Sequence, residues 1–142
     1  MEKINFKKKF GQNFLSDTNL LRAIVSDSLI TPNDEVLEIG AGAGALTYEL
    51  AKVCKKLISF EIDKSLENIL NEKLNSFNNV KLIFSDIMKI KTIDIDNYFE
   101  NNYKIVANLP YYITTPIIFK FLEESKKLNS MTIMVQKEVG EK

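Results

Sequence analysis

The sequence contains no histidine and a single cysteine, Cys54. The first absence removes the most common general base and the most common metal ligand, and it excludes Ser-His-Asp and Cys-His hydrolase mechanisms within this chain. The second absence excludes an internal disulfide bond and a cysteine-cluster metal site. We therefore predict no metal centre, and we expect any reaction to rely on carboxylates, amides or backbone groups.

The sequence also lacks an apolar run of the roughly 18–20 residues that span a bilayer. Its lysine-rich start lacks the apolar stretch of a secretory signal, and a lone cysteine is typical of a reducing compartment. We therefore predict a cytoplasmic protein that does not contact membranes. Its 142 residues, 45% hydrophobic and 27% charged, are typical of one globular domain.

The net charge is zero, so the chain as a whole is not a polycation. Positive charge nevertheless gathers near the start, at Lys3, Lys7, Lys8 and Lys9, against Glu2 alone. Two interpretations stay open for these lysines. They form a solvated tail, or they contact the phosphates of a nucleic acid, and the second gains support only if the rest of the chain points to nucleic acid.

Apolar spacing predicts a helix over residues 16–32, capped by Ser16 or Asp17 and ended by Pro32. Pro116 is expected in the first turn of a later helix, where proline is tolerated, and the polar stretch 87–102 is expected to be a loop. Short, apolar strands that alternate with helices predict an α/β fold, with a mostly parallel sheet covered by helices on both faces. The predicted strands lie within 33–39, 55–63, 79–86, 103–110 and 130–136, and the further helices over 45–54, 64–77 and 114–129.

In such a sheet, ligands bind outside the carboxyl ends of the strands. The stretch EIGAGAG, at 38–44, follows a predicted strand and opens a predicted helix, and its glycines allow a tight turn close to a ligand. From Gly40 the pattern G-x-G-x-x-A fits a dinucleotide fingerprint, and Glu61, 21 positions later, suits ribose hydroxyls. These two features leave NAD and S-adenosylmethionine equally open.

Three further features favour S-adenosylmethionine. Glu38 precedes the glycines, where an acid suits a ligand's ammonium group or orders the turn but does not suit a pyrophosphate. Asp86 ends a strand where it would accept a hydrogen bond from an adenine amino group; alternatively, it caps a turn or helix. Residues 108–111, Asn-Leu-Pro-Tyr, end the next strand, where dinucleotide enzymes have no standard use for them.

At this point the motifs become specific. The chain resembles the ribosomal RNA adenine N6-dimethyltransferases, and in particular the bacterial type that modifies two adjacent adenines near the 3′ end of small-subunit (16S) rRNA. The resemblance implies a Rossmann-like class I methyltransferase fold, S-adenosylmethionine as methyl donor, and small-subunit rRNA or a 30S precursor as partner in ribosome biogenesis. The motifs are FGQNFL (10–15), EIGAGAG (38–44), FEID (60–63), SDI (85–87), NLPYYITTPI (108–117) and MVQKEV (134–139).

Carried over by position, the resemblance implies a set of cofactor contacts. Gly40 would approach the methionine part of the cofactor, Glu61 the ribose hydroxyls and Asp86 the adenine amino group. Asn108 would lie between cofactor and substrate, and Gln12 would support the same side of the cofactor-binding site. The implied cofactor-binding residues are Asn13, Leu15, Gly40, Glu61, Asp86 and Asn108.

The implied catalytic residues are Asn108, Leu109, Pro110 and Tyr111. An exocyclic adenine amine is a poor nucleophile and a sulfonium is an activated donor, so orientation matters more than a strong base. The Asn108 side-chain oxygen and the Leu109 carbonyl, held extended by Pro110, would accept from the amine. Tyr111 would stack on a base that has left its own stack, and Tyr112 is assigned a structural role.

The sequence stops at Lys142, whereas the resemblance implies further strands, a loop with a second aromatic residue and a small helical C-terminal domain. We therefore expect the N-terminal part of a catalytic domain over 1–142, with a basic segment and helix over 1–30, a core over 31–142 and no C-terminal helical domain. The strand at 131–136 is expected at an exposed edge, prone to pair with another chain. Such a chain is expected to bind S-adenosylmethionine weakly if at all, and not to dimethylate RNA efficiently.

Three alternatives stay open. The macrolide-resistance 23S rRNA methyltransferases share the scaffold. They are expected to have isoleucine in place of Leu109, a residue other than tyrosine in place of Tyr112, and no MVQKEV motif. A non-catalytic ribosome-assembly or RNA-binding module could use the same scaffold. A nicotinamide-dependent oxidoreductase would leave Asp86 and Asn108 without a role.

Overall fold

The structure, a computed structural model, describes residues 4–9 and 17–136, and for residues 4–9 and 136 it describes the backbone alone. Six strands and five α-helices, with two short 3-10 turns, follow one another in these residues. In chain order they are β1 (Ile4–Lys9), α1 (Thr18–Asp27), β2 (Glu35–Ile39), α2 (Ala45–Ala51), β3 (Lys56–Glu61), η2 (Lys64–Leu66), α3 (Glu67–Lys73), β4 (Val80–Phe84), η3 (Ile87–Lys89), α4 (Thr92–Asp96), β5 (Tyr103–Pro110), α5 (Tyr111–Glu124) and β6 (Leu128–Gln136).

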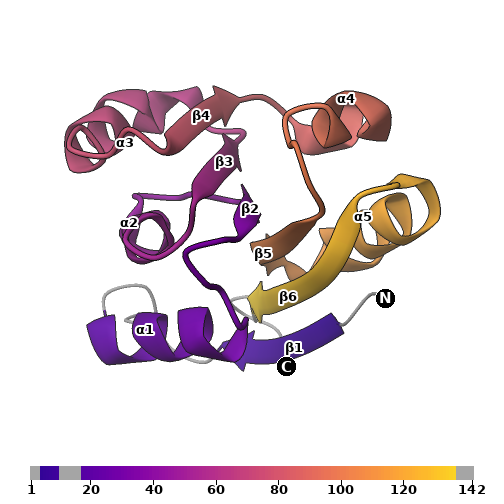
Figure 1. Cartoon of the computed structure of the whole chain (residues 1–142), viewed down its shortest axis with the longest axis horizontal. Coiled ribbons are helices and arrows are strands. Elements are labelled where there is room, and N and C mark those ends of the chain that lie inside the picture. Colours follow the sequence, from indigo (N-terminus) through magenta and orange to yellow (C-terminus); the bar gives the residue numbers. More distant parts are fainter. Residues whose placement is uncertain (1–3, 10–16, 137–142) are drawn as a thin grey trace.

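All six strands are parallel and form one sheet in the order β1-β6-β5-β2-β3-β4. Helices α1, α2 and α3 lie on one side of the sheet, and α4 and α5 lie on the other (Figure 1). The predicted α/β class, with a parallel sheet covered on both faces, is confirmed. Strands covered on both faces are mostly apolar, and all five residues of β2 are buried, including the two glutamates Glu35 and Glu38.

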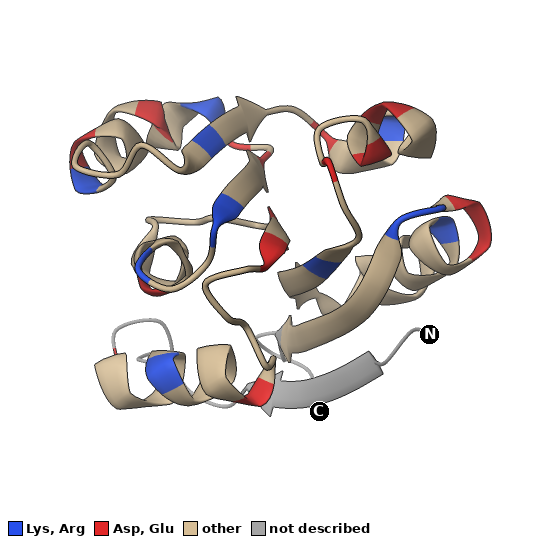
Figure 2. Cartoon of the chain, viewed as in Figure 1, with Lys and Arg blue, Asp and Glu red and all other residues tan. Residues whose placement is uncertain are grey.

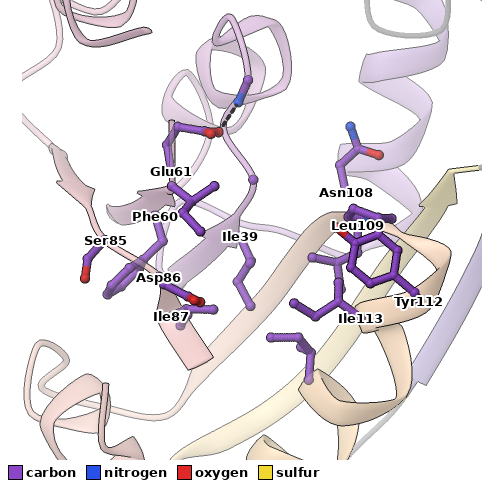
Figure 3. Close-up of a pocket in the computed structure, with 15 residues that line it drawn as sticks. Ile39, Phe60, Glu61, Ser85, Asp86, Ile87, Asn108, Leu109, Tyr112 and Ile113 are labelled. Atoms are coloured by element: carbon purple, nitrogen blue, oxygen red, sulfur yellow. Dashed lines mark hydrogen bonds between the residues drawn. The ribbon is translucent and has the colours of Figure 1, made fainter. Parts of the chain in front are cut away.

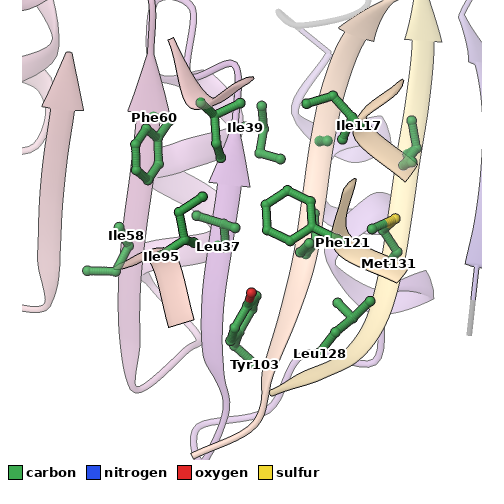
Figure 4. Close-up of a cluster of buried hydrophobic side chains, with 14 of the residues drawn as sticks. Leu37, Ile39, Ile58, Phe60, Ile95, Tyr103, Ile117, Phe121, Leu128 and Met131 are labelled. Atoms are coloured by element: carbon green, nitrogen blue, oxygen red, sulfur yellow. The ribbon is translucent and has the colours of Figure 1, made fainter. Parts of the chain in front are cut away.

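The two faces of the sheet carry separate apolar cores because successive strand residues point to opposite faces. Leu37 and Ile39 of β2 face the α4 and α5 side, where they pack with Phe121 of α5 and Ile95 of α4 (Figure 4). The intervening residue Val36 faces α1 and α2. These cores fix the strand ends relative to one another.

The N-terminal end of α1 matches its prediction. Asp17 is the cap residue, and its side chain accepts a hydrogen bond from the Leu20 N–H at 3.1 Å. Ser16, the other predicted cap, lies outside the described residues.

Residues 87–102 were wrongly predicted to be a loop, because they contain η3 and the short helix α4. Asp96, at the end of α4, is buried and is the centre of a polar network. It accepts hydrogen bonds from the Tyr103 hydroxyl at 2.7 Å, the Ser125 hydroxyl at 2.8 Å and the Lys126 N–H at 2.9 Å. These tertiary contacts stabilise a helix that is too short to show a clear apolar period.

The start of α5 was also predicted wrongly. The helix begins at Tyr111 and not at residue 114, so Pro116 lies in its second turn and not in its first, and it ends at Glu124. The Thr114 hydroxyl donates to the Pro110 carbonyl at 3.1 Å, which satisfies one backbone acceptor next to the helix start. Tyr111 and Tyr112 therefore belong to the first turn of a helix.

The prediction that residues 131–136 form an exposed edge is wrong. β6 lies between β5 and β1, and Ile4 to Lys9 pair in parallel with Met131 to Gln136. An edge strand leaves a row of backbone N–H and C=O groups unpaired, and here the chain's own N-terminal segment pairs with them. The expected self-association through this strand therefore loses its basis, and residues 4–9 of the expected basic segment form a strand.

Basic and acidic residues are interspersed along the described elements (Figure 2). The lysines singled out near the start lie outside this description, Lys3 entirely and Lys7, Lys8 and Lys9 by their side chains. A free tail does not fit Lys7 to Lys9, because their backbone belongs to β1, and their contact with phosphates stays a prediction.

Candidate functional site

A cavity of about 360 Å³ opens at the carboxyl ends of the central strands. Glu61 and Asp86 lie on one side of it, and Asn108 and Tyr112 on the other (Figure 3). The sequence predicted that these strand ends would meet, because parallel strands share an edge. The lining residues come from the ends of β2, β3, β4 and β5 and from the start of α5; they are Ile39, Gly40, Gly42, Phe60, Glu61, Ile62, Ser85, Asp86, Ile87, Asn108, Leu109, Pro110, Tyr112, Ile113 and Ile117.

Gly40 is the point where the glycine turn touches β5. Its φ of +90° belongs to the left-handed region, and a Cβ placed on it would lie 2.7 Å from the Asn108 carbonyl oxygen. Such a distance is shorter than any real Cβ contact. Only glycine therefore allows the turn to lie directly against the backbone of Asn108.

The Glu61 carboxylate lies at the end of β3 and is 9% exposed. Its Oε1 accepts a hydrogen bond from the Gly42 N–H at 2.8 Å, and its Oε2 accepts from the Asp63 N–H at 2.9 Å. Each carboxylate oxygen can accept more than one hydrogen bond. Glu61 therefore holds the glycine turn in place and still has acceptor capacity at the cavity wall.

Asp86 caps a turn and also lines the cavity. It is the cap of η3, and its Oδ1 accepts from the Met88 N–H at 3.0 Å. It also lines the cavity. The capping alternative is confirmed, and a contact with an adenine amino group stays a prediction.

Asn108 is 7% exposed, and its side-chain oxygen has no hydrogen-bond partner in the described structure. Leaving a buried acceptor without a partner costs about 1–3 kcal/mol. Buried polar atoms are therefore almost always paired, and an exception at a cavity wall indicates a ligand-binding position. Leu109 and Pro110 complete β5 and line the same cavity.

One of the two tyrosines departs from its predicted role. Tyr112 lines the cavity and is 73% exposed, so it is not a packed structural residue. Tyr111 is 65% exposed and does not belong to the lining. Stacking of a base by Tyr111 stays a prediction, and Tyr112 is a second exposed aromatic ring beside it.

Glu38 is completely buried one residue before the lining starts at Ile39. Its Oε1 accepts hydrogen bonds from the Thr47 hydroxyl at 2.6 Å and the Ser59 hydroxyl at 2.7 Å, while its Oε2 has no partner. Burial raises the pKa of Glu38 from 4.5 to about 7, against the lowering effect of the two hydroxyls. Of its two predicted roles, a contact with a ligand's ammonium group and the ordering of the turn, its contacts fit the second.

Other predicted cofactor residues cannot be placed. Asn13, Leu15 and Gln12 lie outside the described residues. Conversely, Ile62, Ser85 and Ile113 line the cavity although the sequence did not single out their roles. Ile62 and Ser85 directly adjoin predicted site residues, and Ile113 follows Tyr112 in the first turn of α5, so their proximity in sequence was the available signal.

Within residues 17–136, no cluster of three or more histidine, cysteine, aspartate or glutamate side chains is arranged to hold a metal ion. In the same part of the chain, no helix has the length and hydropathy needed to cross a membrane.

A family model described as ribosomal RNA adenine dimethylase matches residues 3–142. The chain belongs to the ribosomal RNA adenine dimethylase family. It is 51% identical over 138 residues to ribosomal RNA small subunit methyltransferase A of Caldanaerobacter subterraneus subsp. tengcongensis, an alignment that covers 96% of this chain and 51% of the relative. The chain thus spans about half the length of the curated dimethylases that it matches.

Two solved structures share this fold. The 23S rRNA methyltransferase ErmE has a TM-score of 0.71 and 31% identity, with 84% of this chain and 48% of ErmE covered. A dimethyladenosine transferase from Plasmodium falciparum has a TM-score of 0.67 and 28% identity, with 81% of this chain and 41% of the transferase covered. The predicted Rossmann-like methyltransferase fold is therefore confirmed for the described part of the chain.

Proposed function

We propose that this chain forms the methyl-transfer site of an S-adenosylmethionine-dependent rRNA adenine N6-dimethyltransferase. The proposed substrate is a pair of adjacent adenines near the 3′ end of small-subunit rRNA, in a 30S subunit or its precursor. The observation that carries the proposal is the unpaired, buried side-chain oxygen of Asn108 at the wall of the cavity. This oxygen is a hydrogen-bond acceptor without a partner, and the proposed target, an adenine amine, carries two N–H groups that need acceptors.

The residues at the cavity fit the methyl donor. Gly42 has no neighbour within 4 Å of where a Cβ would stand, so the turn leaves open space beside the carboxylate of Glu61. Glu61 would accept from the ribose hydroxyls, and Asp86 from the adenine amino group. When bound, S-adenosylmethionine supplies an activated methyl group on a positively charged sulfur.

The chain's own residues orient the amine that receives the methyl group. The side-chain oxygen of Asn108 accepts from one N–H of the amine, and the Leu109 carbonyl, whose direction is restricted by Pro110, accepts from the other. Two such acceptors favour a pyramidal nitrogen with its lone pair directed at the methyl group, so orientation replaces a strong base. The proton leaves to water after transfer, which suits a chain without histidine.

The exposed rings of Tyr111 and Tyr112 suit the flipped-out base. An adenine inside a helix is out of reach and must leave its stack before its amine enters a cavity. Aromatic rings recover part of the lost stacking energy, about 1–3 kcal/mol for each base. Tyr111 is proposed to stack on the base, with Tyr112 at the edge of the cavity.

The alternatives differ in the support they have. A 23S rRNA target is the second candidate, because ErmE shares 31% identity with this chain, against 51% for the small-subunit relative. A non-catalytic assembly module would not need an unpaired acceptor at Asn108. A nicotinamide enzyme would leave both Asp86 and Asn108 without a ligand.

Methyl transfer under single-turnover conditions tests the proposal. The chain, in excess, is incubated with labelled S-adenosylmethionine and small ribosomal subunits that lack the modification, and the modified nucleosides are identified by mass spectrometry. We expect N6-methyladenosine and N6-dimethyladenosine in small-subunit rRNA, and a loss of at least a hundredfold in rate for Asn108→Ala. Asn71→Ala, an exposed substitution on α3, is the control.

The outcomes separate the candidates. Equal rates for Asn108→Ala and for the unchanged chain contradict the assigned role of Asn108. Modification of large-subunit rRNA instead supports the 23S alternative. Calorimetric titration with NAD and with S-adenosylmethionine distinguishes the nicotinamide enzyme, because only one of the two ligands should bind.

A further inference from the structure

The buried carboxyl group of Glu38 has an unusual set of partners. Both of its hydrogen bonds, from Thr47 of α2 and Ser59 of β3, reach the same oxygen, Oε1, and its Oε2 has none in the described structure. Among residues 17–136, it forms no salt bridge with a lysine or arginine. A carboxylate that is completely buried without a cation pays the desolvation cost of its charge largely uncompensated.

The groups that surround Glu38 do not offset the desolvation cost of its negative charge. From α2 it faces the Thr47 hydroxyl; from β3 it faces the Ser59 hydroxyl and the like charge of Glu61, which raises its pKa further. Its partner on β5 is the buried apolar residue Val106. The thiol of Cys54 nearby is neutral, because burial raises its pKa to about 12. The pKa of Glu38 is accordingly about 7.

Glu38 lies directly behind the wall of the cavity. The next residues along β2, Ile39 and Gly40, line it, and so does Glu61, which is two residues beyond Ser59 on β3. A positive charge bound in the cavity would therefore be a counter-charge for both carboxyl groups. An opposite charge favours the ionised form of an acid and lowers its pKa.

We infer that Glu38 is a proton-linked positioning residue: a cationic ligand that binds at the glycine turn does so with release of the Glu38 proton to solvent. The inference rests on the proposed function, because it takes the sulfonium of S-adenosylmethionine as the cation. The ionised carboxylate accepts more strongly from Thr47 and Ser59 and so tightens the contacts of β2 with α2 and β3. The demethylated product, S-adenosylhomocysteine, carries no charge on sulfur and therefore stabilises the ionised form of Glu38 less.

The composition makes this proton easy to observe. The chain has no histidine, which is the side chain that most often exchanges a proton near neutral pH. The α-amino group of the ligand is common to S-adenosylmethionine and S-adenosylhomocysteine. A difference between the two ligands therefore reports on the sulfonium charge alone.

Isothermal titration calorimetry of the chain in buffers with different ionisation enthalpies measures the protons released on binding. At pH 7 we expect S-adenosylmethionine to release roughly half a proton, as a group with a pKa near 7 would, and S-adenosylhomocysteine to release less. Glu38→Gln keeps the acceptor at Oε1 and removes the titration, so its binding should release no such proton. Ser59→Ala removes one donor and should move the release to higher pH.

Each outcome decides something. Binding with the same proton release in the unchanged chain and in Glu38→Gln overturns the inference and leaves the proposed function intact. No binding of either ligand contradicts the proposed function and the inference with it. If Glu38→Gln does not fold, the carbon-13 chemical shift of the Glu38 carboxyl group in the unchanged chain gives the answer: its midpoint must lie near neutral pH and fall by at least one unit when S-adenosylmethionine is bound.

Discussion

At the scale of residues, Gly40 brings the glycine turn after β2 into contact with Asn108 on β5. Its backbone lies so close to the Asn108 carbonyl that any side chain would overlap with it. The acceptor on β5 and the turn after β2 are thus held together by the absence of a single Cβ atom. A change at Gly40 should therefore affect the turn and the proposed methyl-transfer residue at once.

We predict that Gly40→Ala lowers the free energy of unfolding by roughly 2–5 kcal/mol. About 1–2 kcal/mol comes from the left-handed backbone and about 1–3 kcal/mol from the overlap. Gly42→Ala is the matched control, because Gly42 also has a positive φ, of +57°, but has open space around a Cβ. Urea unfolding of both variants tests this, and equal losses would show that the contact with Asn108 costs nothing.

Individual site residues could be predicted to the extent that they follow strands. Glu61, Asp86 and Asn108 meet at one cavity because the carboxyl ends of parallel strands share an edge of the sheet. The partners of Glu38 could not be predicted, because Thr47 and Ser59 reach it from two other elements. The exposure of Tyr112 likewise depends on where α5 begins, which its sequence pattern did not reveal.

At the scale of elements, α4 depends on Asp96 rather than on its own length. Five residues are too few for a helix to be stable alone, and Asp96 ties this one to the residues between α5 and β6 through Ser125 and Lys126. The same contacts explain why 87–102 resembled a loop. The network forms between distant parts of the chain, and a local pattern of apolar residues does not contain it.

We predict that Asp96→Ala lowers the free energy of unfolding by roughly 3 kcal/mol, because the Tyr103 hydroxyl and the Lys126 N–H lose a charged acceptor. Asp94→Ala, an exposed change on the same helix, should alter it by no more than about 0.5 kcal/mol. Thermal unfolding followed by circular dichroism compares the two. Similar losses for both variants would mean that the buried network contributes little.

At the scale of the whole molecule, Glu38 should make stability depend on pH. Its pKa is about 7 in the folded chain and near the ordinary 4.5 in the unfolded chain. Between these values the folded state binds more protons, so stability is highest below pH 4.5 as far as this group is concerned and falls as the pH rises through 7. The full effect is roughly 3 kcal/mol.

We therefore predict that the unchanged chain loses stability between pH 5 and pH 8, while Glu38→Gln loses much less. Urea unfolding at several pH values gives both curves, and their difference isolates Glu38 from the other carboxylates. Parallel curves for the two proteins would contradict a raised pKa at this position.

The parallel direction of strands β2 to β6 could be predicted from the sequence, but their order in the sheet and the existence of β1 could not. Each of the strands β2 to β6 is a short apolar run next to a helix, and this alternation favours parallel neighbours. Residues 4–9 are rich in lysine, and their partner strand lies at the other end of the sequence. Pairing between such distant segments is set by which backbone groups remain unpaired in the folded sheet, and no local pattern records it.

We predict that removal of residues 1–9 makes the chain self-associate, because β6 would then present its unpaired backbone groups at an edge. Removal of residues 1–3 alone, which leaves β1 in place, is the control. Sedimentation velocity at several concentrations measures the association. If the chain without residues 1–9 stays monomeric, β1 is not what protects β6.

The pairing of β1 with β6 also sets an order of events during synthesis. Residues 4–9 leave the ribosome well before residues 131–136, the segment with which they pair. At about 5–20 residues per second, the interval is on the order of ten seconds. Throughout that time the lysine-rich segment lacks its partner strand, and β1 can pair in the sheet only after β6 has been synthesised.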